Sequence, residues 1–132
     1  MTTKELGDLG EKLACEYLVK KGYNILERNY RISFGEIDVI CRKRWGLFKK
    51  NDKTIHFVEV KTIMAQDGFF PEERVDFAKQ RKLKQLCQIW LEKKHFPQDI
   101  PYQIDIIGVS VNETTGQAKL AYFPNAVEDS KT

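Results

Sequence analysis

Two short apolar stretches of the chain carry acidic residues in their middles. Residues 35–40 read Gly-Glu-Ile-Asp-Val-Ile, and residues 57–62 read Phe-Val-Glu-Val-Lys-Thr. The β-branched and aromatic residues in both stretches are typical of buried strands. Because an unpaired charge is costly to bury, an acid in the middle of such a strand needs either a partner or a chemical task.

Strand geometry predicts which side chains of the first stretch share a face. Successive residues of a strand point to opposite sides of the sheet. Asp38 is therefore expected on the same face as Glu36, and Ile37 on the other face with Val39 and Cys41.

The second stretch places Glu59 and Lys61 on one face by the same rule. If the two strands are neighbours, roughly 4.8 Å apart, Asp38 and Glu59 can meet over one cation. Two carboxylates suit Mg²⁺, or Mn²⁺ in its place, with water as the remaining ligands. Such an ion polarises a phosphoryl oxygen and activates water, and Lys61 would stabilise charge that develops on the phosphate. The alternative is a solvent-facing Glu59–Lys61 ion pair.

Basic residues gather in two clusters near these strands. One cluster follows the first acidic strand and contains Arg42, Lys43, Arg44, Lys49, Lys50 and Lys53, against Asp52 alone. The other lies on a predicted helix and contains Lys79, Arg81, Lys82 and Lys84. Either cluster taken alone is more typical of a solvated face, but both flank the acidic positions in sequence. Together they favour a nucleic acid as partner.

The elements that must position these residues follow from hydrophobic periodicity. Helices are predicted over residues 3–21 and 75–94, where apolar residues recur at helical spacing. Strands are predicted over residues 23–32, 36–42, 56–62, 102–112 and 117–123. This order predicts an α/β layered domain with a mixed sheet. We place one domain over residues 1–124 and a flexible polar tail over 125–132, because no linker divides the chain.

Composition excludes several classes of protein. The chain has 132 residues, of which 42% are hydrophobic and 31% charged, with a net charge of +3. That is enough apolar side chain for a core, which argues against a disordered chain. No apolar stretch approaches the length of a spanning helix and no signal peptide is apparent, so we expect a cytoplasmic protein without a membrane partner. The three cysteines show no pairing or zinc-like spacing and are expected to be reduced core thiols.

The paired motifs resemble those of a known family. Residues 35–40 and 57–62 look like the signature of the YraN-like uncharacterised bacterial family, which belongs to the PD-(D/E)XK nuclease superfamily. The resemblance extends to Gly10-Glu11, to residues 29–31 (Asn-Tyr-Arg) and to residues 79–83 (Lys-Gln-Arg-Lys-Leu). It implies a restriction-endonuclease-like three-layer fold, with a central mixed sheet flanked by helices. It also implies Mg²⁺-dependent phosphodiester hydrolysis at the acidic strands.

The resemblance assigns roles position by position. Asp38, Glu59 and Lys61 match the catalytic motif, although Ile37 replaces the motif proline before Asp38. Glu11 resembles the first-helix glutamate that archaeal Holliday-junction resolvases use as an additional metal ligand.

Two glycines support this role for Glu11, because Gly7 and Gly10 would let the helix approach a sheet edge closely. Glu36 and Gln80 are candidates for supporting roles around the metal ligands. For Gln80 the ordinary alternative is a surface position, and for Glu11 it is a solvated flank of the helix.

Three functions remain open from the sequence. The first is a Mg²⁺-dependent nuclease acting on DNA, with a preference for branched structures and, for cutting two strands, a homodimer. The second is a nucleic-acid-binding module that cleaves nothing, and the third is an interaction protein whose charges are surface pairs. His56 is expected to be an ordinary surface histidine. Asp105 is expected to be a buried structural acid, with an added member of the site as the alternative.

Overall fold

The computed structural model describes residues 1–44, 52–65 and 77–127, with the backbone alone for residues 77–79. Its elements in chain order are α1 (Thr3–Lys20), β1 (Tyr23–Ile32), β2 (Gly35–Lys43), β3 (Ile55–Met64), α2 (Phe77–Lys93), β4 (Tyr102–Val111) and β5 (Ala118–Phe123). Each predicted helix and strand is present, and each end lies within two residues of the expected one.

Local sequence explains where α1 begins and ends. The Thr2 side chain accepts a hydrogen bond from the Glu5 backbone, and the Glu5 side chain accepts one from the Thr2 backbone. This capping box satisfies two backbone donors that a helix start otherwise leaves open. The helix stops before Gly22, whose φ of 97° is a left-handed conformation that favours glycine.

The five strands form one mixed sheet in the order β1-β2-β3-β4-β5. The β1–β2, β2–β3 and β4–β5 pairs are antiparallel, whereas β3 and β4 run parallel and pair along their whole length. Since α2 lies between β3 and β4 in sequence, it is the crossover that a parallel pair requires.

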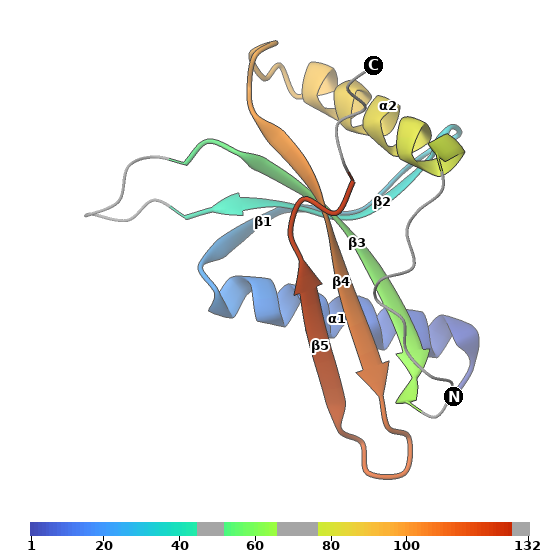
Figure 1. Cartoon of the computed structure of the whole chain (residues 1–132). Coiled ribbons are helices and arrows are strands. Elements are labelled where there is room, and N and C mark those ends of the chain that lie inside the picture. The colour runs from blue at the N-terminus through green and yellow to red at the C-terminus, as the bar shows by residue number, and fades with distance from the viewer. Residues whose placement is uncertain (45–51, 66–76, 128–132) are drawn as a thin grey trace.

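The two helices pack on opposite faces of the sheet, as Figure 1 shows. The core beneath α1 is made of buried residues that include Leu18, Val39, Val58, Ile107 and Val109. The core beneath α2 contains Ile40, Phe57, Leu86, Trp90 and Ile104. The predicted α/β arrangement of two helices around a mixed sheet is therefore confirmed. No helix in the described parts of the chain is long and apolar enough to cross a membrane.

The expected alternation along β2 is wrong at Ile37. Ile37 and Ile40 both pack in the core beneath α2, whereas Val39 and Cys41 pack beneath α1. The physical reason lies on the partner strand β1, where Asn29 adopts a φ of 52°. The pairs on either side of Asn29 place it across from Asp38. The strand therefore changes its facing at Asp38 itself.

The chain after β5 turns back onto the sheet. The N–H groups of Asn125 and Ala126 donate to the Asp105 carboxylate and the Ile104 carbonyl, and Val127 is buried. The first three residues of the expected tail are thus bound to the domain. Residues 128–132 lie outside the described part of the chain.

Candidate active site

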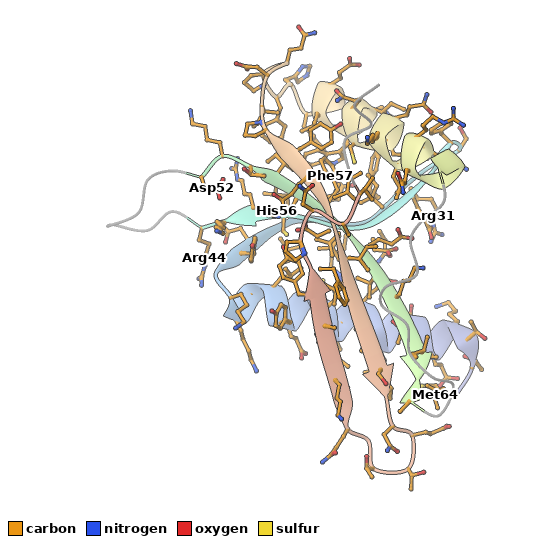
Figure 2. The ribbon with its side chains drawn as sticks, viewed as in Figure 1. Arg31, Arg44, Asp52, His56, Phe57 and Met64 are labelled. Atoms are coloured by element: carbon orange, nitrogen blue, oxygen red, sulfur yellow. The ribbon has the colours of Figure 1, made fainter. Side chains whose placement is uncertain are left out.

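Strands β2 and β3 diverge where the two acidic motifs meet. They pair at Cys41↔His56, Ile40↔Phe57 and Val39↔Val58, and Asp38 and Glu59 come directly after the last of these pairs. Beyond this point the β1–β2 hairpin runs toward α2, while β3 continues along α1 (Figure 1). Arg31 and Met64 mark the two separated ends in Figure 2. A sheet that forks in this way leaves room for a ligand between its strands.

Asp38 bridges the fork with its side chain. The Val60 backbone N–H donates to Asp38 Oδ2 at 2.8 Å. In a continuous antiparallel ladder, a backbone carbonyl of β2 would accept the hydrogen bond from this N–H group. Here the Asp38 carboxylate accepts it instead. This contact links the two acidic motifs directly, in agreement with the expectation that Asp38 and Glu59 belong to adjacent strands.

The surroundings of Asp38 disfavour its charged form. Burial raises the pKa of Asp38 from its ordinary value of 3.8 to about 6, and the Val60 hydrogen bond opposes this rise only in part. The nearby carboxyl groups of Glu11, Glu59 and Glu36 raise this pKa further. Four acidic side chains from α1, β2 and β3 thus act on one another, an arrangement that a bound cation would stabilise.

Glu11 reaches this cluster because α1 comes very close to β3. A Cβ built on Gly10 would lie 1.7 Å from Thr62 Oγ1, so only glycine fits at this crossing. Gly7, by contrast, has nothing within 4 Å, and the expectation that both glycines serve the approach is wrong for Gly7. Glu11 Oε1 is buried without a hydrogen-bond partner in the described structure. Burial raises the pKa of Glu11, against the attraction of Arg28.

The fork opens into a cleft of about 670 Å³. Asp38, Glu59 and Glu36 line it from the sheet, and Lys82 and Leu83 line it from α2. The cleft is therefore acidic on its strand side and carries a lysine on its helix side. An acidic wall facing a cation is suited to a phosphate ester that is bound through both a metal ion and an ammonium group.

Of the other predicted site residues that the structure describes, Glu36 lines this cleft, whereas Lys61 and Gln80 do not. Lys61 follows Glu59 by two residues on β3 and is half-buried. Glu36 is mostly exposed and its Oε2 pairs with Arg31 Nε at 2.9 Å, so it is held toward the hairpin surface. Gln80 is half-buried in the first turn of α2.

The two basic clusters lie in different parts of the structure. Arg42, Lys43 and Arg44 lie at the end of β2 remote from Asp38, where Lys43 pairs with Asp52 at 3.7 Å. Figure 2 shows Arg44 and Asp52 at this end, away from Arg31 and Met64. Lys49, Lys50 and the side chain of Lys79 lie outside the described residues. Arg81 is exposed beside Lys82, so α2 is the basic element at the cleft.

The acidic side chains fit a divalent ion in their chemistry. Carboxylate oxygens from two strands converge on the fork, and Glu11 contributes a buried oxygen without a donor. Among residues 1–44, 52–65 and 80–127, no three acidic, histidine or cysteine side chains form a ready-made metal site. The arrangement therefore fits Mg²⁺ held by one or two carboxylates and water, rather than an ion enclosed by protein ligands.

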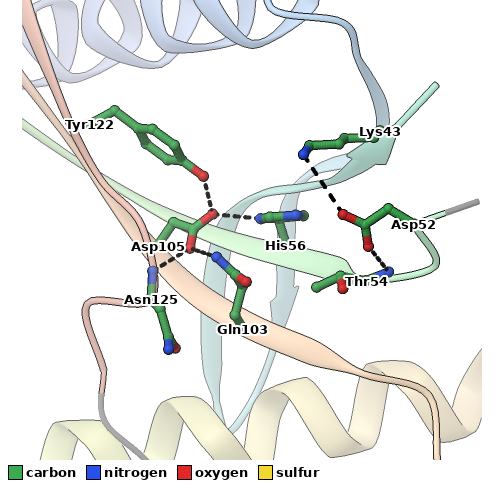
Figure 3. A network of polar contacts seen from close by, with 8 residues as sticks. All are labelled: Lys43, Asp52, Thr54, His56, Gln103, Asp105, Tyr122 and Asn125. Carbon is green, nitrogen blue, oxygen red and sulfur yellow. Dashed lines mark hydrogen bonds and ion pairs between the residues drawn. The ribbon is translucent and has the colours of Figure 1, made fainter. Parts of the chain in front are cut away.

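A second buried aspartate lies elsewhere on the same sheet and is fully satisfied. Asp105 on β4 is held by His56, Gln103, Tyr122 and the Asn125 backbone N–H, as drawn in Figure 3. His56 is buried, so its expected surface position is wrong, because β3 places it beside the β4 strand that carries Asp105. Burial raises the pKa of Asp105, but the hydrogen bonds from these groups outweigh burial and leave it lowered.

Sequence reasoning missed two features of the cleft. One is the Val60 N–H bond to Asp38, which arises only where two strands separate. The other is that Lys82 lines the cleft itself, with its Nζ 5.6 Å from the centre of the Phe34 ring. No local pattern signals the second feature, because it depends on how α2 packs on the start of β2, where Gly35 lies against Lys82 and Leu86.

Comparison with known proteins finds relatives along nearly the whole chain. The profile of the uncharacterised protein family UPF0102 matches residues 10–109. A UPF0102 protein of Dictyoglomus turgidum is 36% identical over 126 residues, which cover 96% of this chain and 99% of the relative. A UPF0102 protein of Caldanaerobacter subterraneus is 43% identical over 109 residues, or 83% of this chain and 82% of the relative. A third, from Roseiflexus castenholzii, is 32% identical over 125 residues, covering 95% and 94%.

Proposed function

The chain belongs to the uncharacterised protein family UPF0102, and for this member we propose a Mg²⁺-dependent nuclease that hydrolyses phosphodiester bonds in DNA. The observation that carries the proposal is the fork between β2 and β3. There Asp38, whose pKa is raised by burial and by the nearby Glu11 and Glu59 carboxyls, lines a cleft together with Glu59 and Lys82. Perturbed carboxyls gathered in a cleft are typical of catalytic sites.

We place the fold in the restriction-endonuclease-like PD-(D/E)XK group on the same grounds. A mixed sheet lies between two helices, and the two acidic motifs occupy adjacent antiparallel strands. Family membership agrees with the YraN-like resemblance, whereas the nuclease superfamily is part of this proposal.

The proposed chemistry assigns a task to each group. Asp38 and Glu59 would hold a divalent ion directly, and Glu11 would hold it through a bound water; the ion would supply Lewis acidity for the phosphoryl oxygen. Water attacks the phosphorus, one P–O ester bond breaks, and the departing oxygen leaves as an alcohol. Lys61 stabilises the charge that develops on the phosphate, and Lys82 binds the substrate backbone from the α2 side. The Val60 N–H fixes Asp38 in its orientation.

One observation favours a second function, a nucleic-acid-binding module that does not cleave. The basic residues Arg81 and Lys82 line or border the cleft without needing a metal ion. Such a module would bind DNA in a salt-sensitive manner, and binding would survive loss of Asp38.

A cleavage assay separates these two functions. The purified protein is incubated with linear duplex, single-stranded and four-way DNA, in Mg²⁺, in Mn²⁺ or in a chelator. We expect cleavage only with a metal ion, and at least roughly 100-fold slower cleavage by Glu59→Gln and Asp38→Asn, which keep the side-chain shape.

Glu113→Gln is the matched control, because Glu113 is an exposed glutamate that pairs with the N-terminus away from the cleft. It should cut like wild type. Equal cleavage by wild type and Glu59→Gln would point to a contaminating nuclease. DNA binding without cleavage under every metal condition would favour the binding module.

A further inference from the structure

A second, shallower groove lies next to the acidic cleft. Its volume is about 520 Å³, which is within the range of small-molecule sites. Its surface is mostly apolar, and it is lined by Phe34, Lys84, Gln85, Gln88, Ile89 and Tyr102. None of these six side chains is acidic.

The groove and the cleft meet at the turn between β1 and β2. Phe34 lines the groove, and the next residue, Gly35, lines the cleft. Lys82 spans the same boundary, because it lines the cleft and its Nζ lies 5.6 Å from the centre of the Phe34 ring. A molecule bound in the cleft can therefore continue into the groove at this turn.

The groove offers the contacts that a nucleobase needs. Phe34 is 39% exposed and Tyr102 is half-buried, so the groove contains two aromatic rings with accessible surface. Gln88 Nε2 donates to the Tyr102 hydroxyl at 3.1 Å, and Gln85 adds a second amide. Aromatic rings stack on bases of any sequence, and amides hydrogen-bond to base edges.

We propose that this groove binds an unpaired nucleobase of the DNA strand whose phosphodiester lies in the acidic cleft. The inference rests on the proposed nuclease function and assigns its substrate class: DNA with at least one unpaired nucleotide next to the cleaved bond. Lys84 lines the groove and Lys82 lines the adjoining cleft, and both are complementary to a phosphate backbone. A fully paired duplex keeps its bases stacked and cannot fill the groove without a base leaving the stack.

Fluorescence binding measurements in a chelator test the groove separately from catalysis. The probes are a single strand that carries 2-aminopurine and its fully paired duplex. The same strand with an abasic position in place of the 2-aminopurine is measured as a competitor of the fluorescent single strand. We expect wild type to prefer the single strand to the duplex, and the 2-aminopurine signal to change on binding. Phe34→Ala should weaken single-strand binding by roughly 5- to 100-fold, and Phe34→Tyr should restore it.

Val19→Ala is the matched control, because Val19 is an exposed apolar residue on α1, on the other face of the sheet. It should bind like wild type, and thermal unfolding of each variant checks that it is folded. Equal binding by wild type and a folded Phe34→Ala, or no effect of the abasic position, would overturn the inference. Base-dependent binding without cleavage in Mg²⁺ or Mn²⁺ would overturn the proposed nuclease and leave the base site standing.

Discussion

Asp38 and Asp105 are two buried aspartates of the same sheet in opposite electrostatic situations. Asp105 accepts hydrogen bonds from His56, Gln103, Tyr122 and the Asn125 backbone, which lower its pKa despite burial. In the described part of the chain, Asp38 accepts one such bond, from Val60, and other carboxyls surround it. Burial and these carboxyls raise its pKa to about 6.

The contrast separates a structural acid from a candidate functional one. Donors from β3, β4, β5 and the segment after β5 stabilise the Asp105 charge, so this carboxylate ties distant parts of the chain together. The charge of Asp38 is left for a ligand to stabilise, which costs folding free energy in the absence of that ligand. Removing each charge should therefore have opposite effects on stability.

The largest effect is expected at Asp105. Asp105→Asn replaces one acceptor oxygen by an NH₂ group, which then faces N–H or O–H donors of its former partners. We expect the unfolding free energy to fall by about 3–5 kcal/mol, because the substitution disrupts a buried, hydrogen-bonded carboxylate and leaves its donors without a charged acceptor. Urea unfolding at pH 7 measures it. Asp8→Asn, at an exposed pair with Lys4, should change it by less than about 0.5 kcal/mol. Similar losses of unfolding free energy in Asp105→Asn and Asp8→Asn would show that Asp105 stabilises the fold no more than an exposed acid does.

Asp38→Asn should stabilise the protein at high pH. The folded-state pKa of about 6 lies above the ordinary value of 3.8, so the group favours folding fully below 3.8 and loses this contribution as pH rises through 6. At 1.36 kcal/mol per pKa unit, the difference is about 3 kcal/mol. Asparagine keeps the Val60 bond without the charge.

Unfolding of wild type and Asp38→Asn in a chelator at pH 4 and pH 8 measures this difference. The unfolding free energy of Asp38→Asn should exceed that of wild type only slightly at pH 4. At pH 8 the difference should approach its full value of about 3 kcal/mol. By contrast, the lowered pKa of Asp105 makes its contribution present above 3.8 and lost only as pH falls through the folded value. A variant less stable than wild type at pH 8 would show that Asp38 is a structural acid like Asp105.

Local pattern predicted the position of Asp38 but not its facing. The sequence shows two apolar strands, each with an acid near its middle. If the strands are neighbours in the sheet, residues at such positions lie close together, which correctly predicted that Asp38 and Glu59 lie near each other. The predicted facing of Ile37 was wrong because Asn29, on the partner strand, adopts a left-handed conformation. A strict alternation of side chains does not take such a residue into account.

Contacts between remote elements were beyond the reach of the sequence. His56 looked like a surface residue because its partner Asp105 is 49 positions away and meets it only through the β3–β4 pairing. The place of Lys82 at the cleft likewise depends on how α2 crosses the sheet. Helix and strand identities, by contrast, followed from periodicity, which is a local property.

The position of Glu11 beside Asp38 depends on Gly10. Gly10→Ala brings a Cβ within 1.7 Å of Thr62 Oγ1, so α1 must move away from β3. We expect a loss of about 1–3 kcal/mol in unfolding free energy and a lower pKa of Asp38, measured by carboxyl NMR titration. Gly7→Ala, in open space, should gain about 0.5–1 kcal/mol and leave that pKa unchanged. An unchanged Asp38 pKa in a folded Gly10→Ala would mean that Glu11 does not act on it.

The smallest effect, and the sharpest test of the comparison, is stabilisation by Mg²⁺. An ion that binds only the folded protein with a dissociation constant near ~1 mM would add about 1.4 kcal/mol at ~10 mM Mg²⁺. Wild type should show this gain in urea unfolding at pH 7.5, relative to NaCl of the same ionic strength, because the ion offsets the repulsion around Asp38. Asp38→Asn should lose most of the gain, whereas Asp105→Asn, although less stable, should keep it, since its network lies apart from the cleft. Equal gains in wild type and Asp38→Asn would assign the stabilisation to general surface binding, and the fork would then lack the property that sets it apart from Asp105.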